Sequence, residues 1–225
     1  NERVKITVIN LGGDYGDTSP DNGKGTLLEK REFIWYNMAR TEEDIIMPRC
    51  ARITFPGAVY HIMNRGNNRQ LLFNEPADFQ KYLQLVSETS RHLGVIVYCY
   101  CLMPTQIHLL AETQTGNLAA LMRGINIRYM IYYKNKYKLI GHLFQGRYKS
   151  ILVDKDSYLL ELTRYIHLNP VRAKLTRLPE EYRWSSYRDF VEPTNSFVDC
   201  APVLAYLGDN NLAAKYHSFV LDRRE

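Results

Sequence analysis

The sequence predicts an α+β fold in which helices cover one face of an antiparallel sheet. Runs rich in β-branched and aromatic residues end at Gly or Pro, and the segments between them show the helical spacing of apolar residues. The order of these segments is β-α-β-β-α-β-α. This is the split βαβ, or ferredoxin-like, arrangement. Because many functions use this fold, function has to be inferred from particular residues.

The first half of the predicted fold is a strand, a helix and a hairpin. Residues 58–66 (AVYHIMNRG) read as a strand that ends in a glycine turn. Residues 78–93 have helical spacing, with Gly94 as the stop. The β-rich run 95–103 closes at a proline and is followed at once by 106–112 (QIHLLAE), so the two pair as a hairpin.

The second half is a long helix, a strand and a final helix. Asn117 stands at the cap position of a helix over 118–137. Residues 146–154 read as a strand, and the helix after it, capped by Asp156 or Ser157, is interrupted at Asn169-Pro170.

Composition and charge narrow the function classes. No apolar run approaches the ~18–20 residues that a membrane span needs, and the four cysteines show no disulfide or CxxC spacing, so we expect a cytoplasmic protein. Residues 1–46 carry a net charge of −3, which leaves +8 on the remainder. A basic body of this size is compatible with a nucleic-acid partner.

Composition and patterning divide the chain into three predicted regions. Residues 1–46 contain a Gly- and Asp-rich stretch and read as a flexible extension, with Met47 near the start of the working domain. Residues 47–190 hold the predicted fold. Residues 191–225 read as a helical C-terminal appendage.

Two ligand-capable side chains lie side by side on the second strand of the hairpin. Gln106 and His108 project from the same face because successive strand residues alternate, and a pair of this kind suits a metal site. The alternative is that His108 is a hydrogen-bonded histidine on a half-buried strand, without a metal.

A second candidate pair lies on the last helix. Tyr165 and Asn169 are four residues apart and therefore share one face. The alternatives are a core tyrosine and an asparagine that caps the turn beginning at Pro170.

Five segments carry a resemblance to a known family. They are FPGAVYHIMNRGNNRQLLF, CYCLMPTQIHLL, GHLFQGRYKSILVD, YLLELTRYIHLNPVRA and YRWSSY, in this order. From about Pro48 to Phe190 the chain resembles the REP-associated tyrosine transposases, which belong to the IS200-like, single-tyrosine transposases. The resemblance implies a nuclease core of the HUH type, named for His-hydrophobic-His on a central strand. It also implies cleavage of single-stranded DNA beside a hairpin, through a 5′-phosphotyrosine intermediate and with Mg²⁺ or Mn²⁺.

The resemblance assigns roles by position. Tyr165 matches the nucleophile, Asn169 the third metal ligand and His108 the second histidine of the HUH pair. The first histidine is replaced by Gln106, since the family usually reads MPNHVHLL where this chain reads MPTQIHLL. Three hypotheses follow: weak activity, a shifted metal preference, or a decayed copy that still binds DNA.

The DNA contacts are expected at basic residues near the strand ends and along the nucleophile's helix. The residues expected to contact phosphates are Arg65, Arg69, Arg147, Lys149, Arg164 and Arg172. The expected partner is single-stranded or hairpin DNA, bound by a monomer or a homodimer. The main alternative is a DNA-hairpin-binding descendant with impaired catalysis. A third hypothesis, an RNA-binding ferredoxin-like domain, is disfavoured because the sequence shows no RNP-type aromatic signature.

Overall fold

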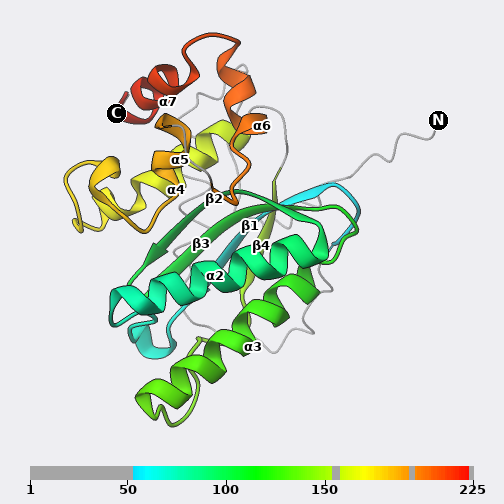
Figure 1. Cartoon of the computed structure of the whole chain (residues 1–225), viewed down its shortest axis with the longest axis vertical. Coiled ribbons are helices and arrows are strands. Elements are labelled where there is room, and N and C mark those ends of the chain that lie inside the picture. The colour runs from blue at the N-terminus through cyan, green and yellow to red at the C-terminus, as the bar shows by residue number, and fades with distance from the viewer. Residues whose placement is uncertain (1–52, 154–157, 193–195, 223–225) are drawn as a thin grey trace, which may run out of the picture. The chain divides into compact units, whose positions relative to one another are not determined.

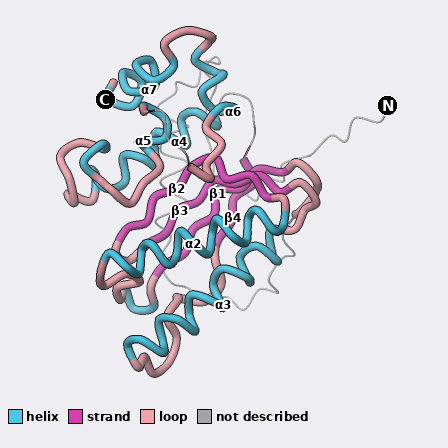
Figure 2. The backbone as a smooth tube through the Cα atoms, viewed as in Figure 1, coloured by secondary structure: helices cyan, strands magenta, loops and turns pink. Residues whose placement is uncertain are grey.

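Four antiparallel strands form a sheet in the order β2-β3-β1-β4 (Figures 1 and 2). The computed structural model describes residues 53–153, 158–192 and 196–222. The strands are β1 (Ala58–Arg65), β2 (Val95–Met103), β3 (Gln106–Thr113) and β4 (Lys149–Val153). The first strand in the chain is thus central, between β3 and β4, as the split βαβ order requires.

The helices follow the predicted order. They are α2 (Pro76–Leu93), α3 (Leu118–Tyr137), α4 (Tyr158–Arg172), α5 (Tyr187–Val191), α6 (Ala201–Leu204) and α7 (Leu212–Leu221), with short 3₁₀ turns at Asn67–Arg69, Pro179–Glu181 and Ala205–Leu207. The predicted α+β, ferredoxin-like class is confirmed. The expected extension over residues 1–46 and the caps Asp156 and Ser157 lie outside the described residues, and the three-region division stays a prediction.

The residues at both ends of α2 are of the types that commonly begin and end helices. Glu75 and Asp78 form a reciprocal capping box, Pro76 occupies the first turn, and Gly94 ends the helix in the left-handed conformation at φ 63°. The fully buried Asp78 carboxylate also accepts hydrogen bonds from Lys136 (2.6 Å) and Tyr137 (2.7 Å) of α3. The capping residue of α2 therefore also holds the two helices together.

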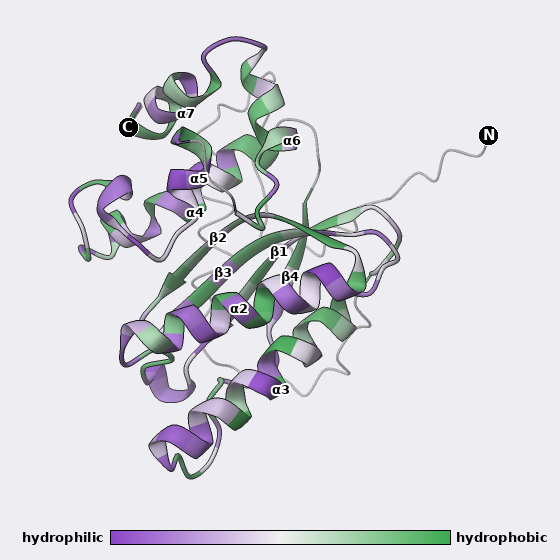
Figure 3. Ribbon diagram, in the orientation of Figure 1, coloured by the Kyte–Doolittle hydropathy of each residue, from purple (hydrophilic) through white to green (hydrophobic). Residues whose placement is uncertain are grey.

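The helices lie on both faces of the sheet, which corrects the expectation of helices on one face. Alternate strand residues such as Tyr60 and Leu109 pack beneath α2 and α3 in one hydrophobic core. Their neighbours Val59 and Leu110 point the other way, into a second core made with α4, α5 and α7. The sheet strands are accordingly apolar along most of their length (Figure 3). Near-continuous apolar runs in β2 and β3 are the sequence signal for this two-sided burial.

The helix α4 continues through Pro170, whereas the sequence predicted an interruption at Asn169-Pro170. Pro170 lies in the last turn, and backbone bonding continues past it, since the Ala173 N–H donates to the Asn169 carbonyl at 2.9 Å. The chain leaves the helix just beyond it, with Lys174 in the left-handed conformation at φ 58°. Asn169 therefore keeps its place on the helical face, one turn after Tyr165.

Candidate active site

Two buried histidines meet on the face of the sheet that α4 covers. His61 of β1 and His108 of β3 are each 4% exposed. In the β1–β3 register Met63 lies opposite His108 and His61 lies opposite Leu110, so the two histidines are diagonal neighbours on one face. His61 Nε2 and His108 Nδ1 are 3.1 Å apart and share a hydrogen bond.

The two rings meet edge to edge. Their centroids are 5.4 Å apart, which is the N···N distance plus one ring radius at each end, and their planes differ by 23°. The two nitrogens therefore point at each other. Burial lowers the pKa of His61 to about 3 and that of His108 to about 4, so both rings are neutral at neutral pH.

Tyr165 of α4 stands over this pair of histidines. Its ring centroid is 6.1 Å from that of His61 and 6.1 Å from that of His108, with interplanar angles of 78° and 79°. The Arg172 guanidinium lies 5.2 Å from the centroid of the Tyr165 ring, two turns further along α4. Burial raises the pKa of Tyr165, and the charge of Arg172 opposes that rise.

The polar atoms near Tyr165 suit a divalent ion. His108 Nε2 is buried and has no hydrogen-bond partner among the residues that the structure describes, and Asn169, also buried, follows Tyr165 by one turn of α4. Gln106 is half-buried and shares the strand face of His108, as predicted, because the two are separated by one residue in β3. A neutral imidazole and amide oxygens are ligands that Mn²⁺ and Mg²⁺ accept. Within the described ranges, no group of three or more His, Cys, Asp or Glu could hold a metal, so an ion here needs the amides.

Comparison with protein families identifies the family of this chain. The family model described as "Transposase IS200 like" matches residues 54–169, which is just over half of the chain and contains His61, Gln106, His108, Tyr165 and Asn169. The chain belongs to the IS200-like transposase family. No curated protein matches the sequence.

Two solved transposase structures are among those similar to this chain. The chain is similar to a REP-associated tyrosine transposase solved with a bound REP hairpin, at 14% identity and a TM-score of 0.56, over 70% of this chain and 93% of that chain. A putative transposase from Deinococcus radiodurans is 19% identical, with a TM-score of 0.36 over 53% of this chain and 95% of that one. The first of these likenesses supports the fold. In the described part of the chain, no helix is long and apolar enough to cross a membrane.

The basic residues predicted to contact DNA do not all lie beside the transposase's candidate site. Lys149 begins β4 opposite Met63, which itself lies opposite His108, so Lys149 shares the histidines' face of the sheet. Arg65 lies opposite Gln106 in the same way. Arg172, as described above, contacts Tyr165.

The other predicted contacts lie elsewhere. Arg164 bonds to Glu161 and lies over the Phe219 ring at 4.6 Å, so it helps to join α4 to α7. Arg69 is exposed in the 3₁₀ turn after β1, and Arg147 is exposed in the loop before β4.

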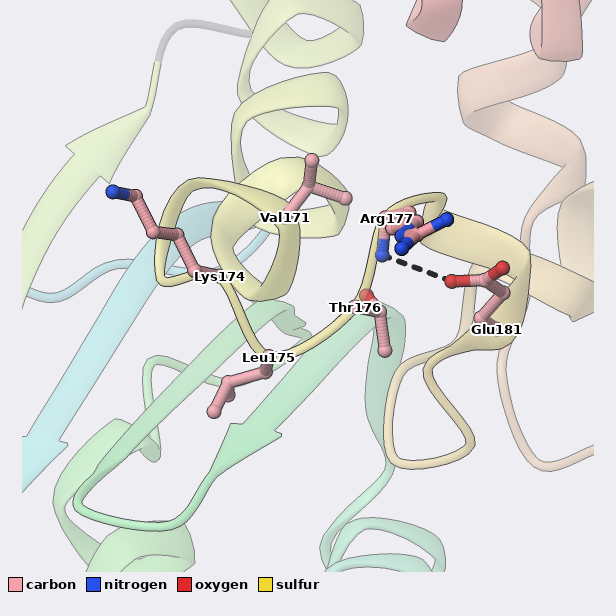
Figure 4. A pocket seen from close by; sticks show the side chains of 6 residues that line it. All are labelled: Val171, Lys174, Leu175, Thr176, Arg177 and Glu181. Atoms are coloured by element: carbon pink, nitrogen blue, oxygen red, sulfur yellow. Dashed lines mark hydrogen bonds between the residues drawn. The ribbon is translucent and has the colours of Figure 1, made fainter.

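A hollow of about 760 Å³ lies where the chain leaves α4 (Figure 4). Its lining residues are Val171, Lys174, Leu175, Thr176, Arg177 and Glu181, and the Arg177 backbone N–H donates to the Glu181 carboxylate at 2.9 Å. The hollow does not include Tyr165 or the histidines. It adds Lys174 and Arg177 to the basic groups that follow the tyrosine's helix.

His61 is the residue that sequence reasoning missed. The alternation in AVYHIMNR places His61 on one face with Val59 and Met63, and this signal was readable. Its relation to His108 was not readable, because the predicted fold places β1 beside β3 but does not fix the register between the two strands.

Proposed function

We propose that this transposase cuts and rejoins single-stranded DNA beside a hairpin, with Tyr165 as the nucleophile. The supporting observation is the position of the Tyr165 ring, edge-on to the His61–His108 pair and beside Arg172. Family membership supplies the transposase chemistry, and the similar transposase with a bound REP hairpin supports the choice of a hairpin.

In the proposed reaction, the Tyr165 phenol loses its proton and its oxygen attacks the scissile phosphorus. A P–O(Tyr) bond forms, the P–O3′ bond breaks, and the departing 3′ oxygen takes up a proton. The products are a 5′-phosphotyrosine and a free 3′-hydroxyl, and the reverse reaction joins ends without a nucleotide cofactor. A divalent ion, when bound, polarises the scissile phosphate.

Different residues of this chain would hold the ion, stabilise the phenolate and contact the DNA phosphates. His108 Nε2 and the amides of Asn169 and Gln106 would hold Mg²⁺ or Mn²⁺. Arg172 favours the phenolate form of Tyr165, which matters because burial alone disfavours it. Lys149 and Arg65, on the same sheet face, would contact the phosphates of the bound strand.

A covalent-adduct assay tests the proposal. End-labelled hairpin oligonucleotides drawn from repeats flanking the gene are incubated with Mn²⁺ and the native chain, Tyr165→Phe or Tyr206→Phe. Tyr206 is 47% exposed and provides a matched control. We expect an adduct with the native chain and with Tyr206→Phe and none with Tyr165→Phe; an adduct that persists in Tyr165→Phe contradicts the proposal.

A second candidate function is a hairpin-binding protein without catalysis. It is favoured by one observation, the amide of Gln106 where the family usually has a histidine. If the native chain binds the hairpin but forms no adduct, and Gln106→His restores the adduct, the second function holds and the first does not.

A further inference from the structure

The hydrogen bond between the two histidines constrains which nitrogen of His108 carries its proton. The two facing nitrogens are buried and only 3.1 Å apart, so one proton lies between them. Either His108 Nδ1–H donates to His61 Nε2, or His61 Nε2–H donates to His108 Nδ1. The two arrangements leave opposite groups at the far side of the His108 ring.

The surroundings of His108 Nε2 decide between these two hydrogen-bond arrangements. His108 Nε2 is buried and has no partner within the described residues. In the second arrangement it is an N–H with no acceptor. In the first it is a lone pair, which a cation satisfies. A ligand histidine commonly donates its other N–H to a neighbouring group that fixes the tautomer and orients the ring.

We propose that His61 is a positioning residue, which accepts the Nδ1–H of His108 and so presents the His108 Nε2 lone pair to the ion beside Tyr165. This inference rests on the proposed function for the identity of the ion, and it adds His61 to the residues of the proposed site. His61 does not replace the missing first histidine as a metal ligand. Two ligand nitrogens would have to face the same ion, whereas His61 Nε2 faces His108 Nδ1.

Ion binding without DNA tests the inference independently of cleavage. Mn²⁺ affinity is measured by calorimetry for the native chain, His61→Phe, His61→Gln and the exposed control His92→Phe. Phe keeps a ring of similar size but cannot accept a hydrogen bond, whereas the Gln amide oxygen can reach the position of Nε2. We expect His61→Phe to weaken Mn²⁺ binding about 10–100-fold, with His61→Gln within about threefold of the native chain.

Ring ¹⁵N NMR provides the spectroscopic readout. We expect His108 of the native chain in the Nδ1–H tautomer, and loss of that preference in His61→Phe while the protein stays folded. Unchanged Mn²⁺ affinity in a folded His61→Phe, an Nε2–H tautomer of His108, or no Mn²⁺ binding by the native chain would each overturn the inference. Failure of the proposed function is seen separately, as an adduct that does not depend on Tyr165.

Discussion

At the scale of single residues, the candidate site is an assembly of neutral groups with the Arg172 guanidinium beside Tyr165. Burial keeps the two imidazoles neutral and raises the pKa of the Tyr165 phenol. Arg172 is the charge that acts in the opposite direction on Tyr165. We therefore expect this arginine to act on the Tyr165 phenol in addition to the DNA contact predicted for it.

This dependence predicts the effect of Arg172→Gln. Because the guanidinium favours the phenolate, its removal should slow adduct formation about tenfold, equivalent to ~1.4 kcal/mol of barrier. Single-turnover adduct rates at saturating DNA separate this effect from weaker binding. Arg128→Gln, at an exposed ion pair between α2 and α3, is the control. Equal rates for Arg172→Gln and the control would show that Arg172 does not act on the tyrosine.

At the scale of elements, α4 is held by its neighbours through a second buried histidine network. His167 Nδ1 pairs with the Tyr216 hydroxyl of α7 at 2.7 Å, and His167 Nε2 pairs with Ser186 Oγ at 2.9 Å. Ser186 Oγ in turn accepts from the Tyr100 backbone N–H of β2 at 2.8 Å. These bonds connect the helix that carries Tyr165 to the sheet that carries His108.

The His167 network predicts a pH dependence of stability. Burial lowers the folded-state pKa of His167 to about 3, against about 6.5 in the unfolded chain. Between these values the unfolded chain binds a proton that the folded chain does not, so the free energy of unfolding falls as pH falls, by up to ~1.4 kcal/mol per pH unit. Urea unfolding of His167→Gln with chelator present should show a pH slope smaller by about that amount. A variant with the native slope would contradict this assignment.

The contact between α2 and α3 predicts a contrast between two acidic residues of α2. Asp78 is fully buried with Lys136 and Tyr137, whereas the Glu88 side chain is 40% exposed in its pair with Arg128. Asp78→Asn should lower the free energy of unfolding by about 2–3 kcal/mol. Glu88→Gln should lower it far less, because solvent screens an exposed ion pair. Equal losses in denaturant titrations would show that burial does not govern the strength of these pairs.

At the scale of the whole molecule, sequence reasoning succeeded where the signal was local. The order of elements and the bounds 95–103 and 118–137 follow from alternation, helical spacing and the Gly and Pro residues between them. The family motifs led to Tyr165, His108 and Asn169, and the structure brings Tyr165 and His108 together. Strand register and the second covered face are long-range properties that local patterns do not determine, and for that reason His61 was missed.

The central proposal is that Tyr165 becomes covalently linked to DNA. The most direct measurement is mass spectrometry of the native chain after reaction with a hairpin oligonucleotide and Mn²⁺, followed by nuclease and protease digestion. The chain has 17 tyrosines, so the position of the modification is informative. We expect a 5′-phosphonucleotide on the peptide that contains Tyr165 and on no other peptide. A modification on a different tyrosine would contradict it.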